Sequence, residues 1–232
     1  MLREKNRSVQ LSEFLRYLAT QAKDDDRLPA LAELSHELGV SVASLREQLE
    51  VARALGVVEV RPKTGIRKQR YSFSPAVRQS LYYAALDDIK YFNQFSEYRS
   101  HIETAYWYEA VSLLTTEDHD RLSHLVKSAQ EKLSGVPVQI PHYEHRELHL
   151  SIFRRLNNPF VMGTLEAYWD LYEATGLDVY TDLRYLNQVW QYQQKMVDAL
   201  RVGNFASGFE ALKEHFDLIY QRERPISRQK FE

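Results

Sequence analysis

The sequence predicts a mainly α protein in two parts: an N-terminal winged helix-turn-helix with a small β-wing, followed by an all-α antiparallel helical bundle. Three observations predict this fold class. Apolar residues recur at helical spacing through most of the 232 residues. Two short β-type runs around a Lys-Thr-Gly turn follow the third predicted helix. Ser74 and Pro75 then interrupt the pattern, so we expect domains at residues 1–74 and 75–232.

Composition excludes several classes of protein. With 44% hydrophobic and 27% charged residues, the chain has the composition of a globular protein and not of a disordered one. No apolar run reaches the roughly 20 residues that a membrane-spanning helix needs, and residues 1–10 lack the apolar core of a signal peptide. The absence of cysteine excludes disulfides and thiolate metal ligands. We therefore expect a cytoplasmic protein with no membrane partner.

Three predicted helices in the N-terminal part have clear start and stop signals. Residues 8–22 carry apolar side chains at helical spacing. Pro29 suits the first turn of the second helix, and Gly39 suits the left-handed residue that ends it. Ser41 is a good N-cap for the third helix, which is expected to end at Gly56. The expected core side chains of the second and third helices are Leu31, Leu34, Leu38, Leu45, Leu49 and Ala52.

The predicted wing is strongly basic. Its strands are expected at residues 57–60 and 66–73. Residues 1–75 carry 13 basic and 10 acidic side chains, although the whole chain has a net charge of −2. Segment 61–70 contains five of those basic residues and no acid. Such a segment is what contact with phosphate groups requires, although a solvated surface loop is the alternative for a charge run taken alone.

A helix followed by a cationic hairpin is typical of a DNA-binding module, because the helix fits the major groove and the hairpin contacts phosphates. In the third helix, Arg46 is placed to reach a phosphate or a guanine edge, and Ser44 to bond a phosphate. The alternative for Arg46 is a surface salt bridge with Glu50, one turn further along the helix. The residues expected to contact DNA are Ser41, Ser44, Arg46, Arg61, Lys63, Thr64 and Gly65.

Residues 28–67 resemble the winged helix of the GntR family of transcription regulators. Two positions depart from the family pattern, because Ala32 and Val42 stand where many members have a DNA-reading arginine. The resemblance therefore implies fewer bidentate contacts to bases and a larger contribution from the wing. The matching residues are Leu28, Pro29, Glu33, Leu34, Gly39, Val40, Ser41, Arg46, Glu47, Leu49, Gly56 and Gly65.

The remainder of the chain resembles the FCD ligand-binding domain of the FadR-type GntR regulators, which is an all-α bundle. Stretches with helical apolar spacing lie at about 76–93, 96–115, 117–134, 141–157, 159–175, 182–202 and 205–222. The resemblance is carried by five short segments: 99–103 (RSHIE), 145–149 (HRELH), 158–159 (NP), 199–204 (ALRVGN) and 214–215 (EH).

The resemblance also implies a site for a divalent metal, which many FCD domains hold through one aspartate and three histidines. The corresponding positions are His145, His149, Gln193 and His215, of which only His149 and His215 keep the residue type of the family. His145 and His149 share one helix face and are both suited to a transition metal, whereas Gln193 would be a weak oxygen ligand. Zinc or nickel would suit this set. The alternative is a site without metal, whose side chains bind an effector directly.

Arg99 is expected to face the same cavity. Arginine binds carboxylates through two parallel hydrogen bonds, so an anionic effector would suit it. The alternative is a buried structural pair with Glu103 at i+4. The effector, a small carboxylate, is thus expected to meet Arg99, His145, His149, Gln193 and His215.

We therefore expect a homodimeric, sequence-specific transcription regulator that binds operator DNA and is controlled by the effector. Repression relieved by the ligand is the usual mode in the family it resembles. One alternative is a winged-helix adaptor that binds protein. Another is a metal-dependent enzyme, because zinc proteases share the spacing of His145 and His149. Their catalytic glutamate directly follows the first histidine, where this chain has Arg146. No catalytic residue is assigned.

Overall fold

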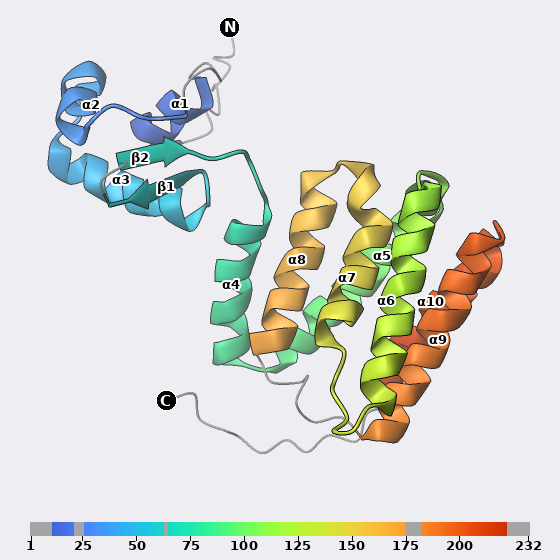
Figure 1. Ribbon diagram of the computed structural model, residues 1–232. Coiled ribbons are helices and arrows are strands. Elements are labelled where there is room, and N and C mark those ends of the chain that lie inside the picture. Colours follow the sequence, from blue (N-terminus) through green and yellow to red (C-terminus); the bar gives the residue numbers. More distant parts are fainter. Residues whose placement is uncertain (1–10, 21–25, 63–64, 175–181, 222–232) are drawn as a thin grey trace, which may run out of the picture. The chain divides into compact units, whose positions relative to one another are not determined.

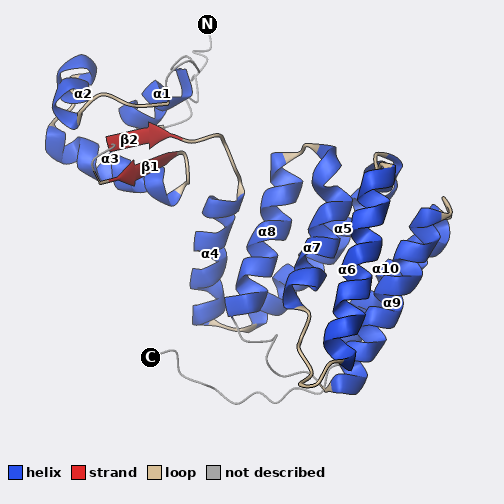
Figure 2. Cartoon of the chain, in the orientation of Figure 1, coloured by secondary structure: helices blue, strands red, loops and turns tan. Residues whose placement is uncertain are grey.

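The computed structural model describes residues 11–20, 26–62, 65–174 and 182–221 (Figure 1). Two compact units divide the chain, residues 1–79 and residues 80–232. The described part of the first unit contains three helices, a two-stranded sheet and the start of a fourth helix. The described part of the second is helical, as the colouring of Figure 2 shows. These elements confirm the predicted fold class, a mainly α chain with a small β-wing.

The first unit has the helix-turn-helix and hairpin order that the sequence predicts. Its elements are α1 (Glu13–Thr20), α2 (Leu31–Leu38), α3 (Val42–Ala54), β1 (Val58–Arg61) and β2 (Gly65–Lys68). The strands pair in antiparallel register, with Val58 opposite Lys68 and Arg61 opposite Gly65. The second strand is shorter than predicted. The Gln69 N–H still donates to the carbonyl of Val57, but the antiparallel ladder itself ends at Lys68.

Capping residues fix the ends of α2 and α3. Gly39 ends α2 with φ +65°, and the Ser41 hydroxyl accepts a hydrogen bond from the Ser44 N–H at 3.2 Å, as predicted. The start of α2 differs from the prediction. Pro29 precedes the helix, and Glu33 accepts a hydrogen bond from the Ala30 N–H at 3.1 Å, which places the N-cap at Ala30.

The core of the first unit is formed by side chains from all three helices and both strands. Leu34, Leu45, Leu49 and Ala52 are buried as predicted, whereas Leu31 and Leu38 are only partly buried at its edge. The remaining core residues come mostly from α1 and the hairpin: Phe14, Leu18, Leu28, Val58 and Ile66.

Ser74 and Pro75 are the first residues of helix α4 (Ser74–Asp87), and not the linker that the sequence suggested. Proline is well tolerated in a first helical turn, because its missing N–H would have no helical acceptor there. Pro75 also packs against the end of α3. A Cβ added to Gly56 would lie 2.4 Å from its Cγ. Gly56 itself has φ +70°, so both backbone conformation and space require glycine here.

The helices of the second unit follow the predicted stretches closely. They are α5 (Lys90–Ser112), α6 (Thr116–Ser134), α7 (His142–Phe153) with the short η1 (Arg154–Leu156), α8 (Pro159–Ala174), α9 (Leu183–Arg201) and α10 (Phe205–Gln221). One break was misplaced. The chain turns at Asp88 and Ile89, earlier than the predicted gap after residue 93. Asp88 accepts a hydrogen bond from the Lys90 N–H at 2.9 Å, which starts α5.

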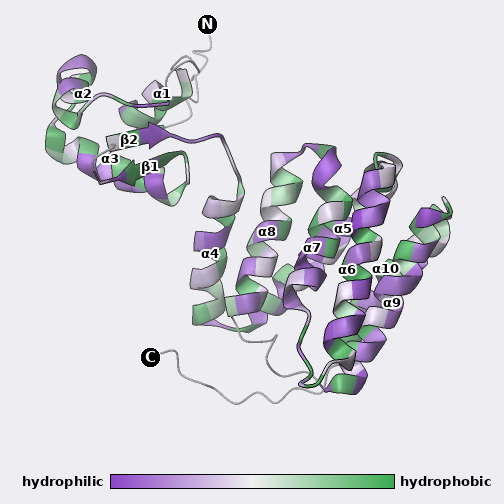
Figure 3. Ribbon diagram, in the orientation of Figure 1, coloured by the Kyte–Doolittle hydropathy of each residue, from purple (hydrophilic) through white to green (hydrophobic). Residues whose placement is uncertain are grey.

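These helices surround a common interior (Figure 1). Helix α6 packs between α7 and α9, α10 packs on α9, and α5 contacts α7, α8 and α10. Hydrophobic residues recur along each helix between hydrophilic ones, as Figure 3 shows. Buried side chains of this interior include Trp107, Leu122, Leu148, Ile152, Leu165, Trp169, Met196 and Leu212. Helix α5 is thus central, and its inward face lies next to α7 and α10.

No helix among the described residues is both long and apolar enough to cross a lipid bilayer.

Candidate functional site

Four helices of the second unit bring the predicted effector residues together. Arg99 comes from α5, His145 and His149 from α7, Gln193 from α9 and His215 from α10. These side chains are buried or partly buried. Hydrogen bonds and an ion pair through Glu103 link Arg99, His149 and Gln193, and the ring of His149 contacts those of His145 and His215, so that all lie in one polar cluster. The structure therefore places them in one site, while their ligand remains a prediction.

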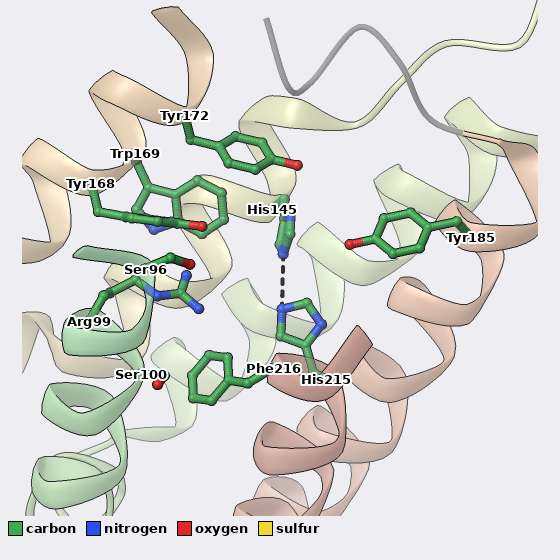
Figure 4. A pocket seen from close by; sticks show the side chains of 10 residues that line it. All are labelled: Ser96, Arg99, Ser100, His145, Tyr168, Trp169, Tyr172, Tyr185, His215 and Phe216. Atoms are coloured by element: carbon green, nitrogen blue, oxygen red, sulfur yellow. Dashed lines mark hydrogen bonds between the residues drawn. The ribbon is translucent and has the colours of Figure 1, made fainter. Parts of the chain in front are cut away.

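The three histidines could hold a metal ion. One ring nitrogen from each lies within 4.8 Å of the others, and His145 Nε2 is 3.3 Å from His215 Nε2 (Figure 4). Burial lowers the pKa of His145 and of His215 well below the ordinary value of histidine, and the neighbouring positive groups lower both further. Both rings are therefore neutral at pH 7, and a neutral imidazole has the lone pair that a metal ligand needs.

Glu103 orients His149. The ring Nδ1 of His149 lies 2.7 Å from Glu103 Oε2, and both side chains are fully buried. Burial raises the pKa of Glu103, but the charge of Arg99 and the contact with His149 more than offset this, so the pKa lies below its usual value. The ionised carboxylate accepts a hydrogen bond from the Nδ1–H of His149. Nε2 is then the nitrogen left for a metal, as in the carboxylate–histidine pairs that support metal ligands.

Arg99 forms the buried pair with Glu103 and also lines a pocket. Its Nε lies 3.3 Å from Glu103 Oε1, so the buried i+4 pair exists. Its guanidinium also faces a small pocket, where the guanidinium carbon is 4.3 Å from the ring centre of Tyr168 and 4.7 Å from that of Phe216. The other residues around this pocket are Ser96, Ser100, His145, Trp169, Tyr172, Tyr185 and His215 (Figure 4).

Two buried donors beside the pocket lack hydrogen-bond partners within the described part of the chain. They are Trp169 Nε1 and Arg99 Nε, whose contact with Glu103 does not have hydrogen-bond geometry. Unsatisfied buried donors are costly, so their presence favours a ligand that brings acceptor atoms. The pocket is small, with room for about one or two water molecules.

A second pocket adjoins the first. Both are lined by His145, Tyr172 and Tyr185, and the second continues along the inner side of α9 at Leu186 and Val189. Tyr185 was not among the predicted site residues, because helical spacing in the stretch 182–202 does not show which of its side chains face the pocket. The Glu103 contact with His149 was also missed, although the position of Glu103 one turn after Arg99 placed it on the same helix face.

In the first unit, Arg46 lies exposed on α3. Its predicted alternative partner, Glu50, instead accepts hydrogen bonds from Arg53 at 2.9 Å. Ser41 caps the helix, and the Ser44 hydroxyl accepts a hydrogen bond from Gln48 Nε2 at 3.2 Å. Arg46 is therefore the side chain of α3 best placed to contact another molecule.

Part of the predicted wing site can be described. Arg61 is exposed and forms an ion pair with Glu59 at 2.7 Å. Gly65 begins β2 with φ +79°, a conformation that favours glycine. Lys63 and Thr64, which were also predicted to contact DNA, lie outside the described residues.

The geometry of α7 differs from that of a zinc protease. Glu147 would be the nearest candidate for a catalytic base after His145. Its carboxylate instead accepts hydrogen bonds from Arg121 at 2.6 Å and from Arg154 at 3.2 Å. It is therefore engaged away from the histidine cluster.

Comparison with known proteins agrees with this architecture. The family model of the FCD domain matches residues 94–218. Among solved structures, the chain is similar to Streptococcus agalactiae GntR, with a TM-score of 0.57 and 15% identity over 85% of this chain and 90% of that one. At this identity the likeness shows a shared fold. No curated protein matches the sequence significantly.

Two further solved structures show weaker similarity. Escherichia coli McbR/YncC has a TM-score of 0.49 and 19% identity, over 91% of this chain and 99% of that one. Lar of Listeria monocytogenes has a TM-score of 0.49 and 14% identity, over 91% and 96% of the two chains.

Proposed function

Because this chain belongs to the FCD-domain family of GntR-type transcription regulators, we propose that it binds operator DNA and is controlled by a small carboxylate effector. The observation that carries the proposal is the polar cluster around Arg99 inside the FCD domain. The guanidinium of Arg99 lies beside a pocket, and two donors there, Arg99 Nε and Trp169 Nε1, have no hydrogen-bond partner among the described residues. The first unit of the same chain is a winged helix-turn-helix.

DNA binding is assigned to α3 and the hairpin. Arg46 is exposed and offers the guanidinium that reads guanine or contacts phosphate. Arg61 and Gly65 belong to the hairpin that would lie beside it. We propose a homodimer that presents two such units to a palindromic operator, because symmetric readers match symmetric sites.

Effector binding is assigned to the pocket at Arg99. A carboxylate would accept hydrogen bonds from the guanidinium, against which the aromatic rings of Tyr168 and Phe216 pack. The donor set of the cluster also fits a divalent metal, zinc or nickel, with His145, His149 and His215 as ligands. Such an ion would act as a Lewis acid that binds the effector carboxylate.

Control of operator binding would follow from a difference in effector affinity between two arrangements of the dimer. An effector that binds one arrangement of the dimer more tightly than another shifts the population toward it. We propose that the effector-bound arrangement fits the operator less well, so that the protein represses without effector and releases DNA with it.

The test begins with DNA. Purified protein is used to select binding sites from random duplexes and from DNA upstream of its own gene, and affinity is measured by fluorescence anisotropy. We expect a preferred palindromic site and an affinity that falls steeply with salt, because phosphate contact releases counterions. A protein-binding adaptor would show no sequence preference and a flat salt dependence, and that result would refute the proposal.

The effector is tested separately by thermal shift. A panel of small carboxylic acids is compared with the corresponding primary amides, which keep the shape but lose the charge. We expect stabilisation by an acid and not by its amide, and release of the selected DNA by the same acid. Equal effects of acid and amide would contradict recognition by Arg99.

A further inference from the structure

Gln193 lies next to the Nε2 nitrogen of His149, whose other ring nitrogen contacts Glu103. Its Nε2 lies 3.0 Å from His149 Nε2, and both side chains are fully buried. We propose that Gln193 competes with a metal ion for His149 and is not a ligand of that ion. This inference rests on the proposed metal site and concerns how tightly the site binds.

The first step concerns the proton of His149. Its Nδ1 lies 2.7 Å from a carboxylate oxygen of Glu103, which can only accept a hydrogen bond. Nδ1 therefore carries a proton, and Nε2 is the nitrogen that can present a lone pair. That lone pair is the one that would bind a metal, because the other nitrogen is engaged with Glu103.

The second step concerns the orientation of the Gln193 amide. Since His149 Nε2 is an acceptor, the atom facing it must be a donor, and only the amide nitrogen can donate. The reverse orientation would place two acceptors 3.0 Å apart. Gln193 Oε1 is then the buried end that finds no hydrogen-bond partner in the described structure. The amide thus keeps one good hydrogen bond, and that bond uses the lone pair of His149.

The third step concerns the other two histidines. His145 Nε2 and His215 Nε2 lie 3.3 Å apart, so one ring donates to the other. Two separate hydrogen bonds thus engage the ring nitrogens of the cluster, one between Gln193 and His149 and one between His145 and His215. Metal binding must break the Gln193 contact with His149 as well as this one, and the cost of breaking them reduces the apparent affinity.

The inference is tested by calorimetry. The protein of residues 1–232 is stripped with chelator and titrated with zinc and, separately, with nickel. The variant Gln193→Leu replaces the amide with an apolar side chain of similar size, which can neither donate a hydrogen bond nor coordinate a metal. Losing a competing hydrogen bond should tighten metal binding about three- to tenfold, which corresponds to the usual net value of one such bond. The control Gln191→Leu, two residues earlier on the same helix and exposed, should bind as the native protein does.

The opposite result, weaker binding by Gln193→Leu, would identify the amide as a ligand and overturn the inference. Equal binding would also overturn it while leaving the metal site in place. If neither protein binds zinc or nickel, both the inference and the metal site fail, whereas operator and carboxylate binding are judged by their own experiments. If Gln193→Leu does not fold by circular dichroism, Gln193→Ala makes the same prediction with less bulk.

A second measurement reports on the hydrogen bond itself. In nitrogen NMR of the metal-free protein, the proton of His149 should remain on Nδ1 in both the native chain and the variant. The Nε2 resonance alone should move when the amide is removed. An Nε2 resonance that does not change would show that Gln193 does not bond this nitrogen.

Discussion

At the scale of single residues, Glu103 holds two neighbours in place. One of its oxygens lies 3.3 Å from Arg99 Nε and the other 2.7 Å from His149 Nδ1. Removing one member of a buried charged set leaves the others without compensation, and that cost usually exceeds the net value of the pair. Glu103 is therefore as important to the site as the residues that face the pocket.

We predict that Glu103→Gln lowers the free energy of unfolding by about 3–5 kcal/mol, because it leaves the buried charge of Arg99 unpaired. Urea denaturation at pH 7 measures this value. The matched control is Glu109→Gln, which is exposed on the same helix and should change the stability little. A loss below about 1 kcal/mol for Glu103→Gln would mean that Arg99 does not depend on this carboxylate.

The residues of the site could be predicted only in part. Arg99 with Glu103, and His145 with His149, are one turn apart on single helices, so their shared faces follow from the sequence. The bonds from His149 to Glu103 and to Gln193 span 46 and 44 positions. They depend on how α5, α7 and α9 pack together, which helical spacing does not determine.

At the scale of helices and strands, the ends of helices were predictable where a capping residue marks them. Gly39 and Ser41 delimit α2 and α3 as expected. The turn between α4 and α5 was missed, because it contains no glycine or proline and Ile89 keeps helical dihedral angles. Asp88 is the only signal there, and aspartate is too common on exposed helices to be decisive.

The packing of α4 on α3 can be tested at Gly56. Both Gly39 and Gly56 have positive φ, but a Cβ at Gly39 would meet nothing within 4 Å. We predict that Gly39→Ala lowers the free energy of unfolding by about 1 kcal/mol, and that Gly56→Ala costs about 1–3 kcal/mol more because of Pro75. Thermal unfolding followed by circular dichroism compares them. Equal losses would mean that Pro75 moves away freely.

The start of α6 should be sensitive to acid. Asp118 bonds Arg155 and the Thr115 N–H, and although burial raises its pKa, these contacts lower it to about 2. A folded pKa below the unfolded value stabilises the protein above about pH 4, and the contribution disappears as the pH falls toward 2. Asp118→Asn should therefore cost about 1 kcal/mol at pH 7, since Arg155 is partly exposed to solvent.

That difference should shrink when denaturation of the native and Asp118→Asn proteins is repeated at decreasing pH. A difference that persists unchanged at pH 2 would mean that capping by the side chain, and not its charge, supplies the stability.

At the scale of the whole molecule, the proposed function assigns DNA binding to the first unit and effector binding to the second. Arg46 tests the first assignment. We predict that Arg46→Ala weakens binding to the selected operator by about 1–3 kcal/mol if it contacts a base, and reduces the salt slope by about 1 if it contacts a phosphate. Fluorescence anisotropy at several salt concentrations distinguishes these cases. The control Arg16→Ala removes an exposed arginine of α1, which pairs with Glu13. Unchanged affinity and slope for Arg46→Ala would exclude α3 as the reading helix.

The aromatic rings around His145 should make the tryptophan fluorescence of the protein sensitive to a bound metal ion. Two of its three tryptophans lie beside this histidine, with ring centres 4.7 Å away for Trp169 and 6.1 Å away for Trp190. Indole fluorescence is quenched by a nearby paramagnetic ion and much less by a diamagnetic one. Nickel in the cluster should therefore dim the intrinsic emission strongly and zinc only slightly, so that the unlabelled chain reports the occupancy of its own interior.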